Sequence, residues 1–227
     1  MKKKRALIVE AHSDDSALGA AGFMEKFRDE YEFHFSLITV SDFYLHHRKE
    51  TVMREERLKE YENYIKHFEG VWHRSGTMPF DNDARMDLVS KALVVREIER
   101  AIENSTPDLL ICQGPSFHHD HTITYEATIA ATRPTARHCP DHILIMENPT
   151  YVHSLGPSTD FKPNYYCSLS EEQIDRKIET FVTCFPGQVR EKDNYLSPES
   201  LKTWAKYRGI ECRHDFAEAF QMYRIVV

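Results

Sequence analysis

RALIVEAHSDDSALGAAG, residues 5–22, is the stretch that decides the fold class of this chain. Residues 5–10 read as a short buried strand. After Asp15 the chain places Gly19 and Gly22 among small and apolar residues, which predicts the start of a helix. A strand, a polar turn and a helix in this order are typical of the opening of an α/β fold.

The rest of the chain continues this alternation. Further strands are expected at residues 33–40, 108–112, 142–146 and 220–227. Helices are expected within residues 48–68, 83–104 and 122–132, after the capping box at 170–173, and after the Ser197-Pro198 pair. The pattern predicts a Rossmann-like three-layer α/β sandwich with a mainly parallel sheet covered on both faces. The Pro- and Gly-containing residues 149–163 are expected to form a surface excursion that could border a substrate cleft.

Length and charge narrow the class of protein. A chain of 227 residues with 41% apolar residues can bury one core, so we expect a single domain over residues 1–227. The 29 Lys+Arg and 36 Asp+Glu residues give 29 − 36 = −7, which does not indicate a basic face for nucleic acid. The apolar run at residues 6–9 is too short for a signal peptide or a membrane span.

The cysteines point to the compartment. The five cysteines are widely spaced, odd in number and without a C-x-x-C pair, which predicts buried free thiols in a reducing environment. We therefore expect a cytoplasmic protein that acts on a small molecule, with its oligomeric state open and a homo-oligomer compatible with the sequence.

Two polar clusters follow predicted strands and precede predicted helices. They are residues 12–15, HSDD, and residues 118–121, HHDH. In a parallel sheet both clusters emerge at the edge formed by the carboxyl ends of the strands, where open α/β sheets bind their ligands. Residues more than a hundred positions apart can therefore form one site.

This pair of clusters predicts a metal site. His12 and Asp15 are three residues apart and can point to one side of the turn, while His121 supplies a second imidazole. Two imidazoles and one carboxylate suit Zn²⁺ and leave a position for water, as catalytic zinc requires. The same ligands could hold Fe²⁺ or another divalent metal.

The neighbouring residues predict catalytic roles. Asp14 need not bind the metal, so it could take a proton from water at the metal and later protonate a departing amine. His118, as an imidazolium, could stabilise the oxyanion of a tetrahedral intermediate. Asp120 is then expected to keep His118 oriented and charged.

Both clusters resemble the motifs of a known family. Residues 11–19, AHSDDSALG, resemble the A-H-P-D-D-x-x-x-G motif of the PIG-L/LmbE-like de-N-acetylases (GlcNAc-PI de-N-acetylase-like), and HHDH resembles their H-P-D-H motif. The resemblance implies an LmbE-like fold, zinc held by His12, Asp15 and His121, and Asp14 as general base. It also implies oxyanion stabilisation by His118, supported by Asp120.

The resemblance extends beyond the two motifs. Residues 54–57, REER, resemble the family's arginine- and glutamate-bearing helix, so either Arg54 or Arg57 corresponds to its substrate-side arginine. Residues 218–220 resemble its carboxyl-terminal E-A-F, and residues 184–188, CFPGQ, resemble a short segment ending in Ser-Gln. Ser13 and His119 stand where the family usually has proline, and the ligand spacing is unchanged.

These residues favour a zinc-dependent N-deacetylase acting on an N-acetylated amino sugar or sugar conjugate. One alternative is a non-haem iron oxygenase that uses the same three ligands. A second is a Rossmann-like module that binds a sugar or nucleotide without turnover. Such a module predicts a G-x-G-x-x-G loop after the first strand, where this chain has HSDD.

Overall fold

The computed structural model describes residues 2–150, 161–192 and 194–227. The strands are β1 Lys4–Glu10, β2 Tyr31–Leu37, β3 Phe43–Leu45, β4 Glu50–Val52, β5 Val71–Trp72, β6 Leu109–Gln113, β7 His142–Met146, β8 Tyr165–Leu169 and β9 Phe216–Ile225. The helices are α1 Asp15–Gly19, α2 Ala21–Lys26, α3 Arg54–His67, α4 Lys91–Ser105, α5 His119–Ala131, α6 Glu171–Cys184 and α7 Pro198–Cys212, with a 3₁₀ turn, η1, at Met86–Leu88.

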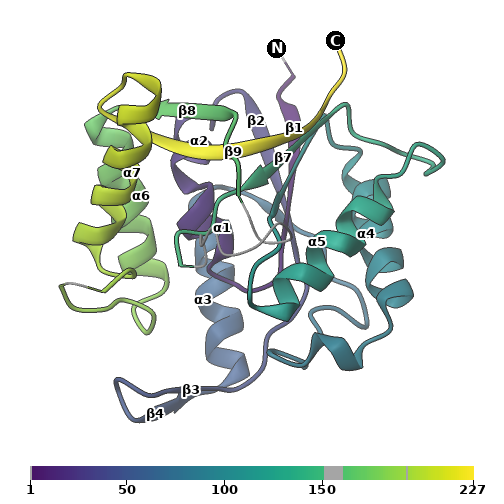
Figure 1. Cartoon of the computed structure of the whole chain (residues 1–227). Helices are drawn as coiled ribbons and strands as arrows, with labels where there is room; N and C mark the ends of the chain where they lie inside the picture. Colours follow the sequence, from purple (N-terminus) through teal and green to yellow (C-terminus); the bar gives the residue numbers. More distant parts are fainter. Residues whose placement is uncertain (1, 151–160, 193) are drawn as a thin grey trace.

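A seven-stranded sheet runs through the molecule in the order β5-β2-β1-β6-β7-β9-β8 (Figure 1). The five strands from β5 to β7 are parallel to one another. Strand β9 is antiparallel to both of its neighbours, β7 and β8. The predicted mainly parallel sheet is confirmed, with antiparallel pairing confined to one side.

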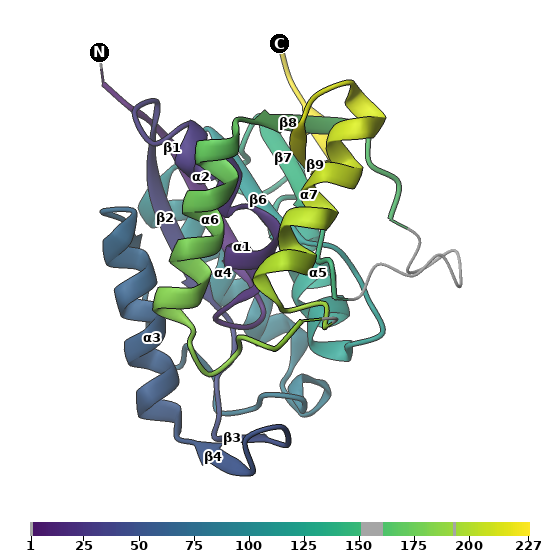
Figure 2. The same cartoon turned by 90° about the vertical axis from the view of Figure 1, so that its left-hand side faces the viewer.

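Helices cover both faces of the sheet, which confirms the three-layer α/β class. Along β1, Ala6 and Ile8 face one core while Leu7 and Val9 face the other, as expected for a strand buried on both sides. Helices α1, α2, α3, α6 and α7 pack on the first face (Figure 2), and α4 and α5 pack on the second.

Several element boundaries differ from the prediction. The helix expected within residues 48–68 begins only at Arg54, because residues 50–52 pair with residues 43–45 as the β3–β4 hairpin. The helix expected within 83–104 is split into η1 and α4, and the one expected at 122–132 begins earlier, at His119. The expected strand at 33–40 ends at Leu37. Strands β5 and β8 are further elements that were not expected from the sequence.

Both predicted helix starts near the carboxyl terminus are confirmed. The Ser170 hydroxyl accepts a hydrogen bond from the backbone N–H of Gln173 at 3.2 Å, and the Gln173 side chain accepts one from the Ser170 N–H at 2.9 Å. This reciprocal pair satisfies two N–H groups at the start of α6. At the start of α7, the Ser197 hydroxyl accepts a hydrogen bond from the backbone N–H of Ser200 at 3.1 Å, and Pro198 lies in the first turn.

The described part of the chain holds no helix that is both long and apolar enough to cross a membrane. All five cysteines are free thiols; three of them are buried, whereas Cys139 is exposed and Cys212 lies between these extremes. Of the expected surface excursion at 149–163, residues 151–160 lie outside the described part.

Candidate functional site

Three adjacent parallel strands, β1, β6 and β7, deliver polar side chains to one edge of the sheet. His12 and Asp15 follow β1, His121 lies in the first turn of α5 after β6, and Asn148 follows β7. Parallel pairing brings the carboxyl ends of these strands together, which is why clusters distant in sequence meet here.

His12, Asp15 and His121 converge on one point. Nδ1 of His12 lies 3.1 Å from Nε2 of His121, and Oδ1 of Asp15 lies 3.2 Å from the same Nε2. Oδ2 of Asp15 lies 3.9 Å from Nδ1 of His12. All three side chains are buried, and one ligand atom from each falls within 4.8 Å of the others. This set of two imidazoles and a carboxylate can hold a divalent metal.

The outward-facing ring atoms of both histidines are fixed by other side chains. Nδ1 of His121 lies 3.0 Å from the Ser116 hydroxyl, and Nε2 of His12 lies 3.2 Å from Oδ2 of Asp120 and 3.3 Å from Oδ1 of Asp83. Such contacts orient metal-binding imidazoles and fix which nitrogen faces the ion. His12 therefore presents Nδ1, and His121 presents Nε2.

Asp15 is fixed from two sides. Its Oδ2 accepts a hydrogen bond from the His12 backbone N–H at 2.9 Å, and its Oδ1 accepts one from the Asn148 side-chain amide at 3.1 Å. The Asn148 carbonyl oxygen accepts from the Thr150 backbone N–H at 3.0 Å, which fixes the orientation of the amide. Burial would raise the pKa of Asp15, but the charge of His121 and its hydrogen bond lower it to about 2.

We expect Asn148→Ala to weaken metal binding by about 10- to 100-fold, the usual cost of losing a group that orients a ligand. The dissociation constant is measured on metal-free protein by competition with a chromophoric chelator. Asn104→Ala is the matched control, because Asn104 is exposed on α4, on the other face of the sheet. Equal affinities for the two variants would contradict the role of Asn148.

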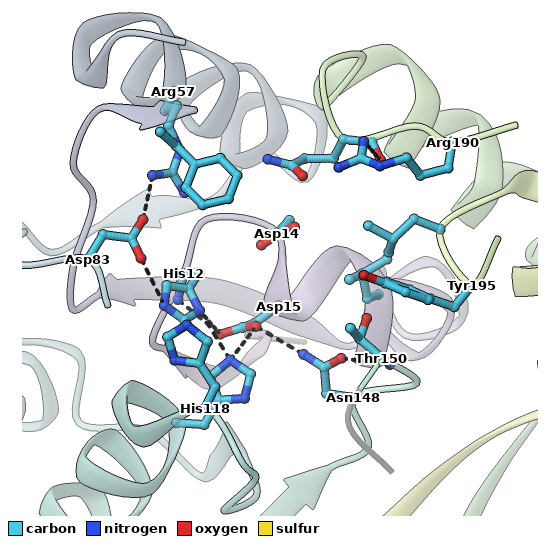
Figure 3. A pocket seen from close by; sticks show the side chains of 15 residues that line it. His12, Asp14, Asp15, Arg57, Asp83, His118, Asn148, Thr150, Arg190 and Tyr195 are labelled. Carbon is cyan, nitrogen blue, oxygen red and sulfur yellow. Dashed lines mark hydrogen bonds and ion pairs between the residues drawn. The ribbon is translucent and has the colours of Figure 1, made fainter. Parts of the chain in front are cut away.

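Asp14 lies at the centre of the pocket, next to but separate from the three converging residues (Figure 3). Its side chain is partly exposed, and burial together with the negative charge of Asp15 raises its pKa. Asp14 thus combines access to the pocket with raised basicity, as a group that exchanges protons requires.

His118 lines the same pocket, but its relation to Asp120 differs from the expectation. Oδ2 of Asp120 lies 3.9 Å from Nδ1 of His118, too far for a hydrogen bond. Asp120 instead accepts hydrogen bonds from the backbone N–H groups of Ala84 at 2.7 Å and Met86 at 3.0 Å, besides its contact with His12. The buried carboxylate forms hydrogen bonds with these N–H groups because they lie closer to it than the His118 ring does.

The charge expected on His118 also differs. Burial and the neighbouring His12 and His121 lower the pKa of His118 to about 4, so its ring is neutral at pH 7 in the described arrangement. A neutral imidazole still carries one N–H and can donate one hydrogen bond.

The two arginines that were candidates for substrate binding make different contacts. Arg57 lines the pocket, pairs with Asp83 and donates a hydrogen bond to the Ser41 carbonyl oxygen at 2.8 Å. Arg54 donates instead to the carbonyl oxygens of Val40 at 2.9 Å and Pro79 at 2.8 Å. Of these two candidates, Arg54 is therefore hydrogen-bonded to the backbone, and Arg57 lines the pocket.

Ser13 and His119, which stand where the family usually has proline, do not prevent the three ligand residues from converging. Ser13 is buried in the turn after β1, and His119 occupies the first position of α5. Nε2 of His119 lies 2.9 Å from the Ala84 carbonyl oxygen, so the side chain points away from the three converging ligand atoms. This contact between the His119 side chain and the backbone thus connects the start of α5 to the loop that contains Ala84.

The cavity at this site has a volume of about 150 Å³. Besides the predicted residues, its walls include Phe43, Asp83, Asn148, Thr150, Arg190 and Tyr195, while Gln188 comes from the segment that resembled a family motif. Asn148 could have been found from the sequence, since it follows a predicted strand at the same sheet edge. Arg190 and Tyr195 lie in a loop with no pattern to single them out.

Comparisons with known proteins give a family and a fold. Residues 7–132 match the family PIG-L, described as GlcNAc-PI de-N-acetylase. The chain is 25% identical to a diacetylchitobiose deacetylase of Thermococcus kodakarensis, over 96% of this chain and 82% of that protein.

Glu218 of the carboxyl-terminal E-A-F accepts backbone hydrogen bonds from Gly22 and Phe23, which connects this motif to α2.

Solved structures of low identity share the fold. The N,N'-diacetylchitobiose deacetylase from Pyrococcus horikoshii has a TM-score of 0.71 at 18% identity, covering 96% of this chain and 83% of that one. The A40926 pseudoaglycone deacetylase Dbv21 reaches 0.73 at 19% identity, covering 100% of both chains. The 4-carboxy-2-hydroxymuconate hydratase from Pseudomonas putida KT2440 reaches 0.70 at 15% identity, covering 99% and 98%. The fold thus also occurs in a protein named for a different reaction.

Proposed function

This chain belongs to the PIG-L family, and on that premise we propose that it is a metal-dependent hydrolase that removes an N-acetyl group from an amino sugar or sugar conjugate. The proposal covers residues 1–227 as one deacetylase domain. The observation that carries it is the convergence of His12, Asp15 and His121 beside the pocket carboxylate of Asp14.

The three converging residues fit a divalent metal, and zinc is the ion we assign. Two imidazole nitrogens and a carboxylate oxygen are a common set of protein ligands for catalytic zinc. The fit also rests on the contacts behind the ligands, because Ser116, Asp120 and Asn148 each hold one ligand in place. Zinc bound there would lower the pKa of a water molecule and polarise the amide carbonyl.

Asp14 carries the proton transfers. Hydrolysis forms a bond between a water oxygen and the carbonyl carbon and breaks the C–N bond, so one proton must leave the water and one must reach the departing nitrogen. Asp14 is a free carboxylate in the pocket, beside the ligands and not among them, and can perform both transfers in turn. The products are acetate and a free amine.

His118 is assigned to the carbonyl oxygen. Its ring lies 4.6 Å from that of His12 and 5.3 Å from that of His121, measured between ring centroids, and it lines the same pocket. An N–H of this ring donates to the oxygen as negative charge develops there, and a neutral imidazole is sufficient. Asp120 acts on His12 and on the backbone of Ala84 and Met86, and so supports the ligand side of the site.

An amino sugar is the substrate class that the relatives' names support. Two of the proteins similar to this chain are named as deacetylases of diacetylchitobiose, and another as a deacetylase of the A40926 pseudoaglycone. The polar walls of the cavity, with carboxylate, amide, hydroxyl and guanidinium groups, suit a ligand rich in hydroxyl groups.

The test is release of acetate from N-acetylated sugars by the zinc-loaded protein. The panel contains N-acetylglucosamine, N,N'-diacetylchitobiose, N-acetylglucosamine 1-phosphate and N-acetylmuramic acid. We expect acetate and primary amine to appear in equal amounts from at least one of them. Amine without acetate, or consumption of oxygen together with substrate, would contradict hydrolysis of an N-acetyl group.

A further inference from the structure

The pocket contains two arginines in different electrostatic situations. Figure 3 shows Asp14 between Arg57 on one side and Arg190 on the other. Arg57 is neutralised, because its guanidinium pairs with Asp83 and also donates to the carbonyl oxygen of Ser41. The positive charge of Arg57 is therefore already balanced by a carboxylate of the protein.

Arg190 has no such partner. Its Nη1 donates to the carbonyl oxygens of Gly187 at 3.1 Å, Gln188 at 2.7 Å and Val189 at 3.4 Å, all on its own segment. Within residues 2–150, 161–192 and 194–227, no carboxylate forms an ion pair with it, and its other guanidinium N–H groups have no acceptor. The backbone contacts hold the side chain in place, and no carboxylate of the described residues pairs with its charge.

The surroundings of Arg190 include further positive charge. Burial lowers the pKa of its guanidinium, and nearby Arg48 acts in the same direction, whereas Tyr195 and Asp14 oppose the change. Arg48 belongs to the turn of the β3–β4 hairpin, where its Nε pairs with Glu50 at 2.7 Å. Partial burial is costly for a cation that has no carboxylate in direct contact among the described residues, so an incoming anion is favoured here.

An acid of α3 also lies close to this segment. Glu60 of α3 contacts the backbone of Gly187, and burial raises its pKa to about 7. Glu60 does not line the cavity and forms no ion pair with a described residue, so within the described part of the chain it does not neutralise Arg190.

We infer that Arg190 anchors an outer subsite for an anionic substituent, a carboxylate or a phosphate, on the N-acetylated sugar. The inference rests on the proposed function and specifies its substrate class. The unused guanidinium N–H groups can donate two parallel hydrogen bonds to a carboxylate or phosphate, the geometry in which arginine binds anions best. Since Arg190 and Asp14 line one cavity, a single substrate can present its acetamide to Asp14 and its anion to Arg190.

The test compares sugars that differ in charge, using zinc-loaded Asp14→Asn protein so that substrate is not consumed. Calorimetry gives the dissociation constants of N-acetylglucosamine, N-acetylglucosamine 1-phosphate and N-acetylmuramic acid. We expect at least one of the two anionic sugars to bind about 10-fold or more tightly than the neutral sugar, the two probes distinguishing phosphate from carboxylate. Adding Arg190→Gln should abolish this preference, while Arg190→Lys should keep part of it.

Arg96→Gln in the same background is the matched control, because Arg96 is exposed on α4, away from the pocket. A preference for the anionic sugars that survives Arg190→Gln would overturn the inference, since the anion would then bind the metal or another group. Equal binding of all three sugars by the Arg190 protein would also overturn it. Failure of the proposed function can be distinguished from failure of this inference. Binding that depends on Arg190, without acetate release by the wild-type protein, would refute the proposed reaction but support the anionic subsite.

Discussion

Asp14→Asn is expected to lower kcat for acetate release by about 10²- to 10⁴-fold, the usual contribution of a group that transfers protons in the transition state. Asparagine has nearly the same shape but cannot accept the proton from water. Because Asp14 is not among the converging ligands, metal content should stay at the wild-type value. Steady-state rates and elemental analysis of the same preparation check both parts.

Asp29→Asn serves as the control for this change, because Asp29 is an exposed carboxylate in the loop before β2. It should retain full activity. An Asp14→Asn protein with wild-type kcat would refute the role of Asp14, and one that loses its metal would show that Asp14 belongs to the ligand set.

His121→Ala is expected to remove the bound metal, with metal content falling from one ion per chain to near zero and acetate release falling with it. The variant loses one of two imidazoles, and the remaining pair, His12 and Asp15, offers too few ligands for a catalytic zinc site. Metal content is measured after dialysis against a weak chelator.

Because His121 is fully buried, its replacement by alanine can also destabilise the fold. His121→Gln fills more of the space and separates the two effects, and thermal unfolding reports on folding directly. His214→Ala, at an exposed histidine after α7, should keep its metal. Full zinc occupancy in folded His121→Gln and His121→Ala would exclude His121 as a ligand.

Much of the fold followed from local pattern. Strand β1 and the helix after it were evident because an apolar run and a polar turn precede small residues, and the caps at Ser170 and Ser197 were correct because their hydrogen bonds are local. The hairpin at residues 43–52 was missed because its pairing joins strands of only three residues within a highly charged stretch. The short strand β5 depends on pairing with distant β2, which no local pattern reports.

The site was predictable where its residues follow strands. His12, Asp15 and His121 converge as expected because β1 and β6 are neighbours in the sheet. The hydrogen bonds that Asp120 accepts from Ala84 and Met86 were not predicted, since the loop that brings these two residues to its carboxylate has no sequence signature. Arg190 could not have been found, because its position depends on a loop held by backbone contacts.

The shared fold does not itself select the reaction, since one structural neighbour is named a hydratase and others are named deacetylases. The three converging residues, as the proposed metal ligands, and Asp14 would serve to activate water in either reaction. Identification of the reaction product therefore distinguishes a deacetylase from a hydratase better than further structural similarity does.

The most direct measurement is the initial rate of acetate release as zinc is added to metal-free wild-type protein, with the panel of N-acetylated sugars as substrates. We expect no release without metal and a rate that rises to a break at one zinc per chain. Acetate release that is independent of metal would contradict the metal-dependent mechanism. One tightly bound zinc with no acetate from any sugar in the panel would contradict the proposed sugar deacetylase.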